Sequence, residues 1–216
     1  MITVLTLIKL PVEFIFFQIL IIDMNELEDR MLQLRNKADY VLDKDKPVIC
    51  MIDGRSFSKL VKRKYELPFS DKFIQTMNET AIYTCKEIQG CVGAYVQSDE
   101  ISFFIDTRPK EDDKITDPFF GFRLCKMNSI IASTATAKYN QLVLCECEYP
   151  KEEPLIQFDC KCWNVENDND VFAWFLFRQL DCIRNSKQQA AQTYLPHKKL
   201  LGLHTDEQIE LLKTEK

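Results

Sequence analysis

Two short runs rich in β-branched and aromatic residues, 92–96 and 101–105, constrain the fold of this chain more than any other feature. Only residues 97–100 separate them, so the two runs predict the strands of one antiparallel β-hairpin. A third apolar run, 47–52, ends at Asp53-Gly54 and is typical of a buried strand followed by a turn. Because helical periodicity separates this run from the hairpin, we expect an α+β fold. It would consist of an antiparallel sheet with helices on one face, similar to a polymerase palm.

The other periodic segments predict the helices and two further strands. Apolar residues recur at helical spacing, so we expect helices over 25–42, 70–85, 119–139 and 170–194 and a short one from Thr205. The runs 142–147 and 155–158 are expected to be strands that pair across a turn containing prolines.

Composition limits the class of protein. A chain of 216 residues with 46% hydrophobic and 28% charged residues is ordinary for one globular domain. The formal net charge of −5 does not indicate a nucleic-acid partner, so any such site must be a local basic patch. Nine cysteines, an odd number, favour free thiols in a reducing compartment. We therefore expect a cytoplasmic location, with an organelle as the alternative.

The first 23 residues form an apolar leader. Lys9, Pro11 and Glu13 interrupt it, so no uninterrupted run of about 18 apolar residues is available to cross a membrane. No small-residue cleavage site precedes Asp23, which also argues against a signal peptide. We expect residues 1–23 to lie outside the core, residues 24–216 to form a single domain, and a membrane anchor to be the less favoured alternative.

Two aspartates stand where strands are expected to end. Asp53 follows the 47–52 run, and Asp99 lies in the turn of the hairpin. If the strand and the hairpin are neighbours in one sheet, both carboxylates reach the same edge. Such a pair favours Mg²⁺, which prefers oxygen ligands, and two ions about 4 Å apart can hold both oxygens of a phosphoryl transfer. The alternative is ordinary turn chemistry, because Asp-Gly and Ser-Asp pairs are common in loops.

Five ordered blocks of the chain resemble the tRNA-His guanylyltransferase family. They are 52–60 with Pro68-Phe69, 94–103, 120–133, Phe158-Asp159-Cys160-Lys161 and 178–186. The resemblance covers about residues 25–212. Where guanylyltransferases proper carry His-Ile-Asn-Asn-Leu-Tyr-Asn, this chain has Arg184-Asn185-Ser186-Lys187, and in this it is similar to the guanylyltransferase-like proteins. The resemblance implies addition of nucleotides in the 3′-to-5′ direction at tRNA 5′ ends, as repair or as tRNA-His guanylylation.

The resemblance also implies a site. Two Mg²⁺ ions would be held by Asp53, the Gly54 carbonyl and Asp99, with Glu100 as an adjacent catalytic acid. ATP or GTP would activate the 5′ phosphate before an incoming nucleoside triphosphate attacks. The implied nucleotide-binding residues are Arg55, Ser56, Phe57, Ser58, Ser98, Arg123 and Lys126. Arg123 and Lys126 are three residues apart, so they share a helix face that we expect beside the acidic site.

An RNA substrate would need local positive charge. The predicted RNA-binding residues are Arg178, Arg184, Asn185 and Lys187, which lie in a basic stretch, and the segment 55–64 adds five cations. Phosphate contacts would make RNA affinity depend on salt. The resemblance implies a tetramer as well, which no feature of the sequence itself indicates.

Three departures from the family pattern leave two other functions open. Met51, Leu67 and Lys161 stand where the family usually carries Arg, Lys and Arg. One alternative is therefore a family member that binds RNA without catalysis. Another is a palm-type enzyme that acts on a different nucleotide substrate, such as a cyclase.

Four cysteines raise the separate question of a zinc site. Cys145 and Cys147, like Cys160 and Cys162, have the i, i+2 spacing that places both thiols on one strand face. Paired strands could bring four sulfurs together, but zinc ligands usually have two intervening residues. Buried free cysteines are the favoured interpretation.

Overall fold

The computed structural model describes residues 24–37, 39–109, 117–146 and 154–215. It divides into two units, residues 1–40 and 41–216, and each is described by itself. In the first unit, helix α2 spans Met24–Asn36. The expected leader, 1–23, lies outside the described residues, and the domain boundary at Met24 stays a prediction.

The second unit is built on a four-stranded sheet with the order β2-β3-β1-β4, and each neighbouring pair of strands is antiparallel. The strands are β1 (Val48–Gly54), β2 (Cys91–Gln97), β3 (Glu100–Ile105) and β4 (Phe158–Asn164). Strands β1 and β3 lie in the middle, which explains why their runs are almost continuously apolar. In register, Asp53 pairs with Glu100 on one side and with Asp159 on the other.

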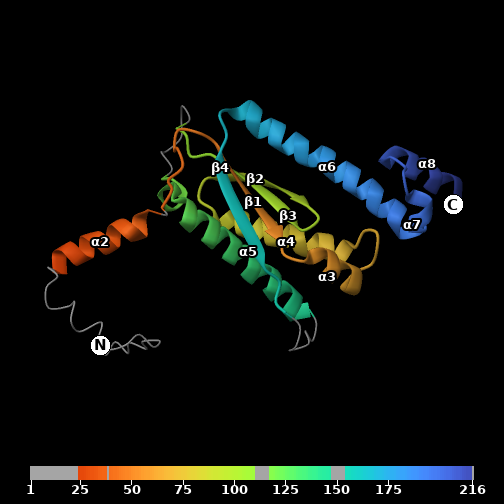
Figure 1. Ribbon diagram of the computed structural model, residues 1–216, viewed down its shortest axis with the longest axis horizontal. Coiled ribbons are helices and arrows are strands. Elements are labelled where there is room, and N and C mark those ends of the chain that lie inside the picture. The colour runs from red at the N-terminus through yellow and green to blue at the C-terminus, as the bar shows by residue number, and fades with distance from the viewer. Residues whose placement is uncertain (1–23, 38, 110–116, 147–153, 216) are drawn as a thin grey trace. The chain divides into compact units, whose positions relative to one another are not determined.

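Helices α4 (Asp71–Glu87) and α5 (Leu124–Glu146) cover one face of this sheet, as Figure 1 shows. Ser70 caps α4 by accepting a hydrogen bond from the Phe73 amide. The inward side chains of the strands, such as Ile52 and Phe103, are completely buried against this layer. The α+β fold with a helical face is therefore confirmed.

Helix α6 (Asp168–Tyr194) contacts the opposite face of the sheet. Its Trp174 Nε1 donates to the Ser102 Oγ at 3.1 Å, and Ser102 alternates with the core residue Phe103. Asn167 caps the helix by accepting from two backbone amides. Helices α7 (His197–Leu200) and α8 (Thr205–Glu215) follow and close a small second apolar cluster around Ala191.

Several element predictions were wrong. The first helix ends at Asn36 rather than near residue 42. The proposed strand 142–147 does not form, because α5 continues to Glu146. The predicted helix 119–139 begins with a 3₁₀ turn, η1 (Phe119–Phe122). Helix α3 (Phe57–Lys64) was not predicted at all. Within the described ranges, none of the helices is both long enough and apolar enough to span a bilayer.

Candidate metal and nucleotide site

The turn after β1 presents a carboxylate at one end of the sheet. Ile52 points into the core, so the next side chain, Asp53, projects from the opposite face and is exposed. Gly54 is buried, and a Cβ at this position would lie 2.3 Å from the Phe57 ring. Ser56 adopts a φ of 62°, which turns the chain into α3. The Asp53 carboxylate and the Gly54 backbone therefore lie next to each other where β1 ends.

The hairpin between β2 and β3 presents the second carboxylate. Gln97 and Glu100 pair across the strands, so Ser98 and Asp99 form a two-residue turn. Ser98 has a φ of 52°, the positive value that such turns require at their first central position. Because Glu100 is the register partner of Asp53, this turn brings Asp99 to the same end of the sheet.

The two carboxylates are close enough to influence each other. Burial raises the pKa of Asp53, and the negative charge of Asp159 on β4 raises it further. Burial also raises the pKa of Asp99, with an additional contribution from Asp53. Neither Asp53 nor Asp99 forms an ion pair with any residue in the described ranges. The charges of Lys161 and Arg178 lower the pKa of Asp53 without forming an ion pair with it. Neighbouring carboxylates without an ion-pair partner are suited to bind a metal ion.

The donor set fits Mg²⁺. It consists of hard oxygen atoms: the carboxylates of Asp53 and Asp99, with the Gly54 carbonyl between them in the chain. Across the described part of the chain, no three His, Cys, Asp or Glu side chains gather as a complete set of protein ligands. A cation at this edge would thus complete its shell with water or substrate oxygens, as Mg²⁺ usually does.

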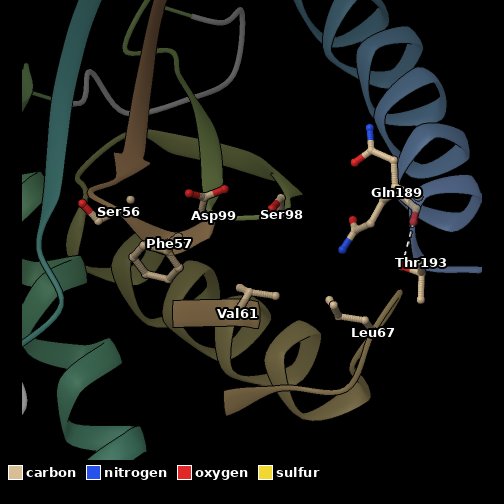
Figure 2. Close-up of a pocket in the computed structure, with 10 residues that line it drawn as sticks. Ser56, Phe57, Val61, Leu67, Ser98, Asp99, Gln189 and Thr193 are labelled. Atoms are coloured by element: carbon tan, nitrogen blue, oxygen red, sulfur yellow. Dashed lines mark hydrogen bonds between the residues drawn. The ribbon is translucent and has the colours of Figure 1, made fainter. Parts of the chain in front are cut away.

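A cavity of about 620 Å³ adjoins Asp99. Figure 2 shows Ser56, Phe57 and Val61 on one side and the helix α6 residues Gln189 and Thr193 across the opening. Gln192 of α6 also lines the cavity. The sequence analysis missed these α6 residues, although their i, i+3, i+4 spacing on one helix face was visible.

A second cavity of about 510 Å³ adjoins the same hairpin turn. Asp53, Asp99 and Glu100 line it, together with Phe69 and Met77 from the chain around α4. Both volumes are within the range of small-molecule sites. Asp99 is common to the two cavities, so the carboxylate pair stands where they meet.

Glu100 and Arg178 pair with each other. Arg178 Nη2 donates to Glu100 Oε2 at 2.7 Å, and the two side chains are only 12% and 15% exposed. Asp181 is the second partner of Arg178, at 3.2 Å. The placement of Arg178 as an RNA contact is therefore corrected: its guanidinium is buried and occupied by two carboxylates. Glu100 is thus held in an ion pair, whereas Asp53 and Asp99 have no ion-pair partner in the described residues.

Arg123 and Lys126 are not beside the carboxylates. Thr136 of α5 accepts from the Phe158 amide at 3.1 Å, and Phe158 pairs with Gly54, so that part of α5 lies at the Asp53 end. Arg123 precedes Thr136 by thirteen residues, which is about 20 Å along the helix. Neither Arg123 nor Lys126 lines the two cavities described. Their expected position beside the acidic site was wrong, and their binding of nucleotide stays a prediction.

The other predicted contacts are scattered around the site. Arg55 donates to Gln157 at 3.0 Å, and the side chain of Ser58 lies outside the described part. Arg184 pairs with Asp181 and is 61% exposed. The remaining two RNA-binding predictions are placed as follows: Asn185 lines the second cavity and donates to Asp181, and Lys187 pairs with Asp206 at 2.6 Å.

The cysteines do not assemble as the zinc hypothesis required. Cys145 is part of helix α5 rather than a strand, and Cys147 lies outside the described residues. Cys160 and Cys162 are free, with their Sγ atoms 3.8 Å apart, and Cys162 is buried in the core. They extend the apolar packing of β4.

The antiparallel sheet, its helical face and the paired acids at one end define the class: an α+β domain of the palm type. The family model described as tRNAHis guanylyltransferase (Thg1) matches residues 29–166. The chain belongs to this family.

Individual relatives agree with this assignment. The chain is 31% identical over 158 residues to a probable tRNA(His) guanylyltransferase of Dictyostelium discoideum, covering 68% of this chain and 57% of that protein. It is 25% identical to the probable human tRNA(His) guanylyltransferase, of which it spans 51%. The chain thus spans little more than half of these curated relatives.

Solved structures are similar over more of their length. A bacterial tRNA(His) guanylyltransferase (Thg1)-like protein in complex with ATP is 35% identical, with a TM-score of 0.79 over 88% of this chain and 78% of that one. A bacterial Thg1-like protein in complex with GTP is 33% identical, with a TM-score of 0.71 over 79% of this chain and 78% of that one.

Proposed function

We propose that this protein is an Mg²⁺-dependent nucleotidyltransferase that adds nucleotides to the 5′ end of tRNA in the 3′-to-5′ direction. The observation that carries the proposal is the position of Asp53 and Asp99 at one end of the sheet, beside two cavities and without an ion-pair partner in the described residues. An ion bound by these acids would neutralise phosphate charge and orient the oxygens that react.

ATP or GTP is the proposed activating substrate. The bacterial relatives named above carry these nucleotides, and either cavity of this chain has the volume that a nucleotide needs. The positive φ of Ser56 bends the backbone at the N-terminus of α3, beside Asp53. Amides at a helix N-terminus favour phosphate, which supports placing the phosphates near residues 55–58.

The amide side chains of α6 would contact the rest of the nucleotide. Gln189 and Gln192 face Phe57 and Val61 across the larger cavity. They can donate and accept hydrogen bonds, whereas Val61 offers apolar contact, and the buried ring of Phe57 supports this wall of the cavity from the core. This combination suits a nucleoside, which has both a planar face and polar edges.

One observation favours the second candidate, an RNA-binding member without catalysis. Leu67, which stands where the family usually has Lys, lines the larger cavity. An apolar side chain there cannot neutralise phosphate charge. Lys161 lies near Asp53 and lowers its pKa slightly against the larger effect of burial, so one cation is still close to the acids.

A primer-extension assay separates these functions. The full chain is incubated with a tRNA that lacks its first 5′ nucleotides, each labelled nucleoside triphosphate in turn, and Mg²⁺. We expect elongation at the 5′ end, with the Asp99→Asn variant as the inactive control. RNA binding without incorporation would favour the non-catalytic candidate. A labelled product formed without RNA would indicate another nucleotide substrate.

We also propose that the protein assembles with copies of itself. Helix α6 exposes one apolar stripe at helical spacing, formed by Phe172, Leu176, Leu180 and Ile183. Neighbouring exposed apolar side chains on one helix face are typical of an interaction surface. Light scattering should give a mass above that of one chain, 25.4 kDa, and Leu180→Glu should lower it. A monomeric wild-type protein would refute the proposal.

A further inference from the structure

The turn that carries Asp99 is held from both sides by helix α6. Gln97 and Glu100 flank the two turn residues. Gln97 Nε2 donates to Asp181 Oδ2 at 3.3 Å, and Glu100 is bound by Arg178 at 2.7 Å. Arg178 lies 78 positions after Glu100 in the chain, and Asp181 lies 84 positions after Gln97. These long-range contacts fix the hairpin against the helix.

These contacts are buried and mutually supporting. Asp181 accepts hydrogen bonds from Gln97, Arg178, Arg184 and Asn185, and its side chain is only 13% exposed. The guanidinium of Arg178 also stacks on aromatic side chains of α6, 5.2 Å from the centre of the Phe177 ring. The charge of Arg178 compensates the buried carboxylates of Glu100 and Asp181, and the more exposed Arg184 adds a second positive charge, which lowers the cost of burying the group.

The turn itself needs such support. Ser98 has a positive φ, and an L-residue in this region costs about 1–2 kcal/mol. A strained turn keeps its shape only where its surroundings enforce it. The two residues that flank the turn are the ones that α6 binds, while Asp99 itself forms no ion pair within the described residues.

We infer that Arg178 and Asp181 are positioning residues, which hold the Ser98–Asp99 turn so that Asp99 faces Asp53. The inference rests on the proposed function in one respect, that Asp53 and Asp99 bind a divalent cation. Asp181 lines neither cavity, whereas Arg178 lines the second cavity beside Asp53 and Glu100. The two residues act on the turn through Glu100 and Gln97, and the charge of Arg178 also reaches Asp53 directly. Positioning of the turn explains a buried Arg178 better than contact with RNA does.

The test measures binding of Mn²⁺ alone to the full chain, by the electron paramagnetic resonance signal of free Mn²⁺, without nucleotide or RNA. Arg178→Met keeps an apolar side chain of similar length but removes the guanidinium group. Asp181→Asn keeps the shape of the side chain but removes its negative charge. Partners of metal-ligating groups typically change metal affinity by about 10–100-fold, so we expect at least a tenfold loss for Arg178→Met. Asp181→Asn should lose less, and Arg178→Lys should recover part of the affinity.

Arg108→Met is the matched control. Arg108 also bridges the sheet to α6, through Asp106 and Asp168, but at the other end of β3. Its loss should lower the melting temperature without changing Mn²⁺ affinity. Equal losses of Mn²⁺ affinity in Arg108→Met and Arg178→Met would reduce the role to general stability and overturn the inference.

Two further outcomes separate this inference from the proposed function. If Arg178→Met binds Mn²⁺ normally but loses salt-dependent RNA affinity, Arg178 is an RNA contact and the inference fails. If the wild-type chain binds Mn²⁺ but transfers no nucleotide, the proposed function fails, while the Mn²⁺ affinities of the variants still decide the role of Arg178. A wild-type chain that binds no Mn²⁺ overturns both.

Discussion

Replacing Gly54 by alanine should destabilise the protein through a single steric contact. The added Cβ would lie 2.3–2.9 Å from three atoms of the Phe57 ring. That ring is 1% exposed and packs on Tyr139 and Phe158, each with a centroid distance of 5.3 Å, so it has little room to move. Overpacking of this kind costs about 1–3 kcal/mol. Alanine also lowers the conformational entropy of the unfolded chain, which offsets about 0.4–1 kcal/mol of this destabilisation.

We therefore expect a net loss of up to about 2.6 kcal/mol with a midpoint of about 1.3 kcal/mol, and the midpoint lowers the melting temperature by roughly 3–5 °C for a unit of this size. Differential scanning calorimetry measures it. Gly93→Ala is the matched control, because a Cβ there meets no atom within 4 Å, and it should not lower the melting temperature. In the double variant Gly54→Ala/Phe57→Leu the smaller side chain should make room, with a coupling energy of about 0.5–3 kcal/mol. Additive losses, or an unchanged melting temperature for Gly54→Ala, would refute the steric argument.

The remaining predictions concern the acids, the cavity and the leader. Asp53→Asn and Asp99→Asn should each abolish nucleotide transfer; a variant with near-wild-type transfer would contradict the two-acid site. Because folding raises the pKa of both acids, their ionisation costs stability as the pH rises above the unfolded value and through the folded one. The metal-free Asp99→Asn variant should therefore melt above wild type at neutral pH, and the difference should vanish at acid pH, as thermal scans across pH would show. Gln189→Ala and Gln192→Ala should raise the KM for nucleotide several-fold, with less effect on kcat and none on melting temperature, in steady-state assays; an unchanged KM would remove α6 from the nucleotide site. A chain started at Met24 should stay soluble and keep the activity of the full chain, and an insoluble product would make the leader part of the structure.

The sheet could be predicted because its signals are local. The β-branched and aromatic residues of β2 and β3 and the short turn that joins them specify a hairpin, and the apolar run of β1 specifies a central strand. Asp53 and Asp99 were found for the same reason, because both follow directly from where strands end. Their proximity was inferred from one assumption, that β1 and the hairpin are neighbours, and the register confirms it.

Other features depend on partners that are distant in the sequence. Arg178 looked like an exposed cation because Glu100, which buries it, lies 78 residues earlier. The run 142–147 has the composition of a strand, yet residues up to Glu146 continue the register of α5, whose interior packing decides the conformation. Arg123 was assigned to the acidic site because residue spacing defines a helix face but not which end of the sheet that face reaches.

Helix α6 connects the hairpin to the larger cavity, because it contacts both. Arg178 binds Glu100 of the hairpin, and Thr193 lines the cavity. The two residues are fifteen positions apart on one uninterrupted helix. At 1.5 Å per residue this is a lever arm of about 22 Å. A tilt of about 5° around Arg178 would move Thr193 by about 2 Å, more than the length of a carbon–carbon bond. The ion pair between Arg178 and Glu100 therefore helps to set the width of a cavity about 22 Å away along α6, which a tilt of about 5° would change by about 2 Å.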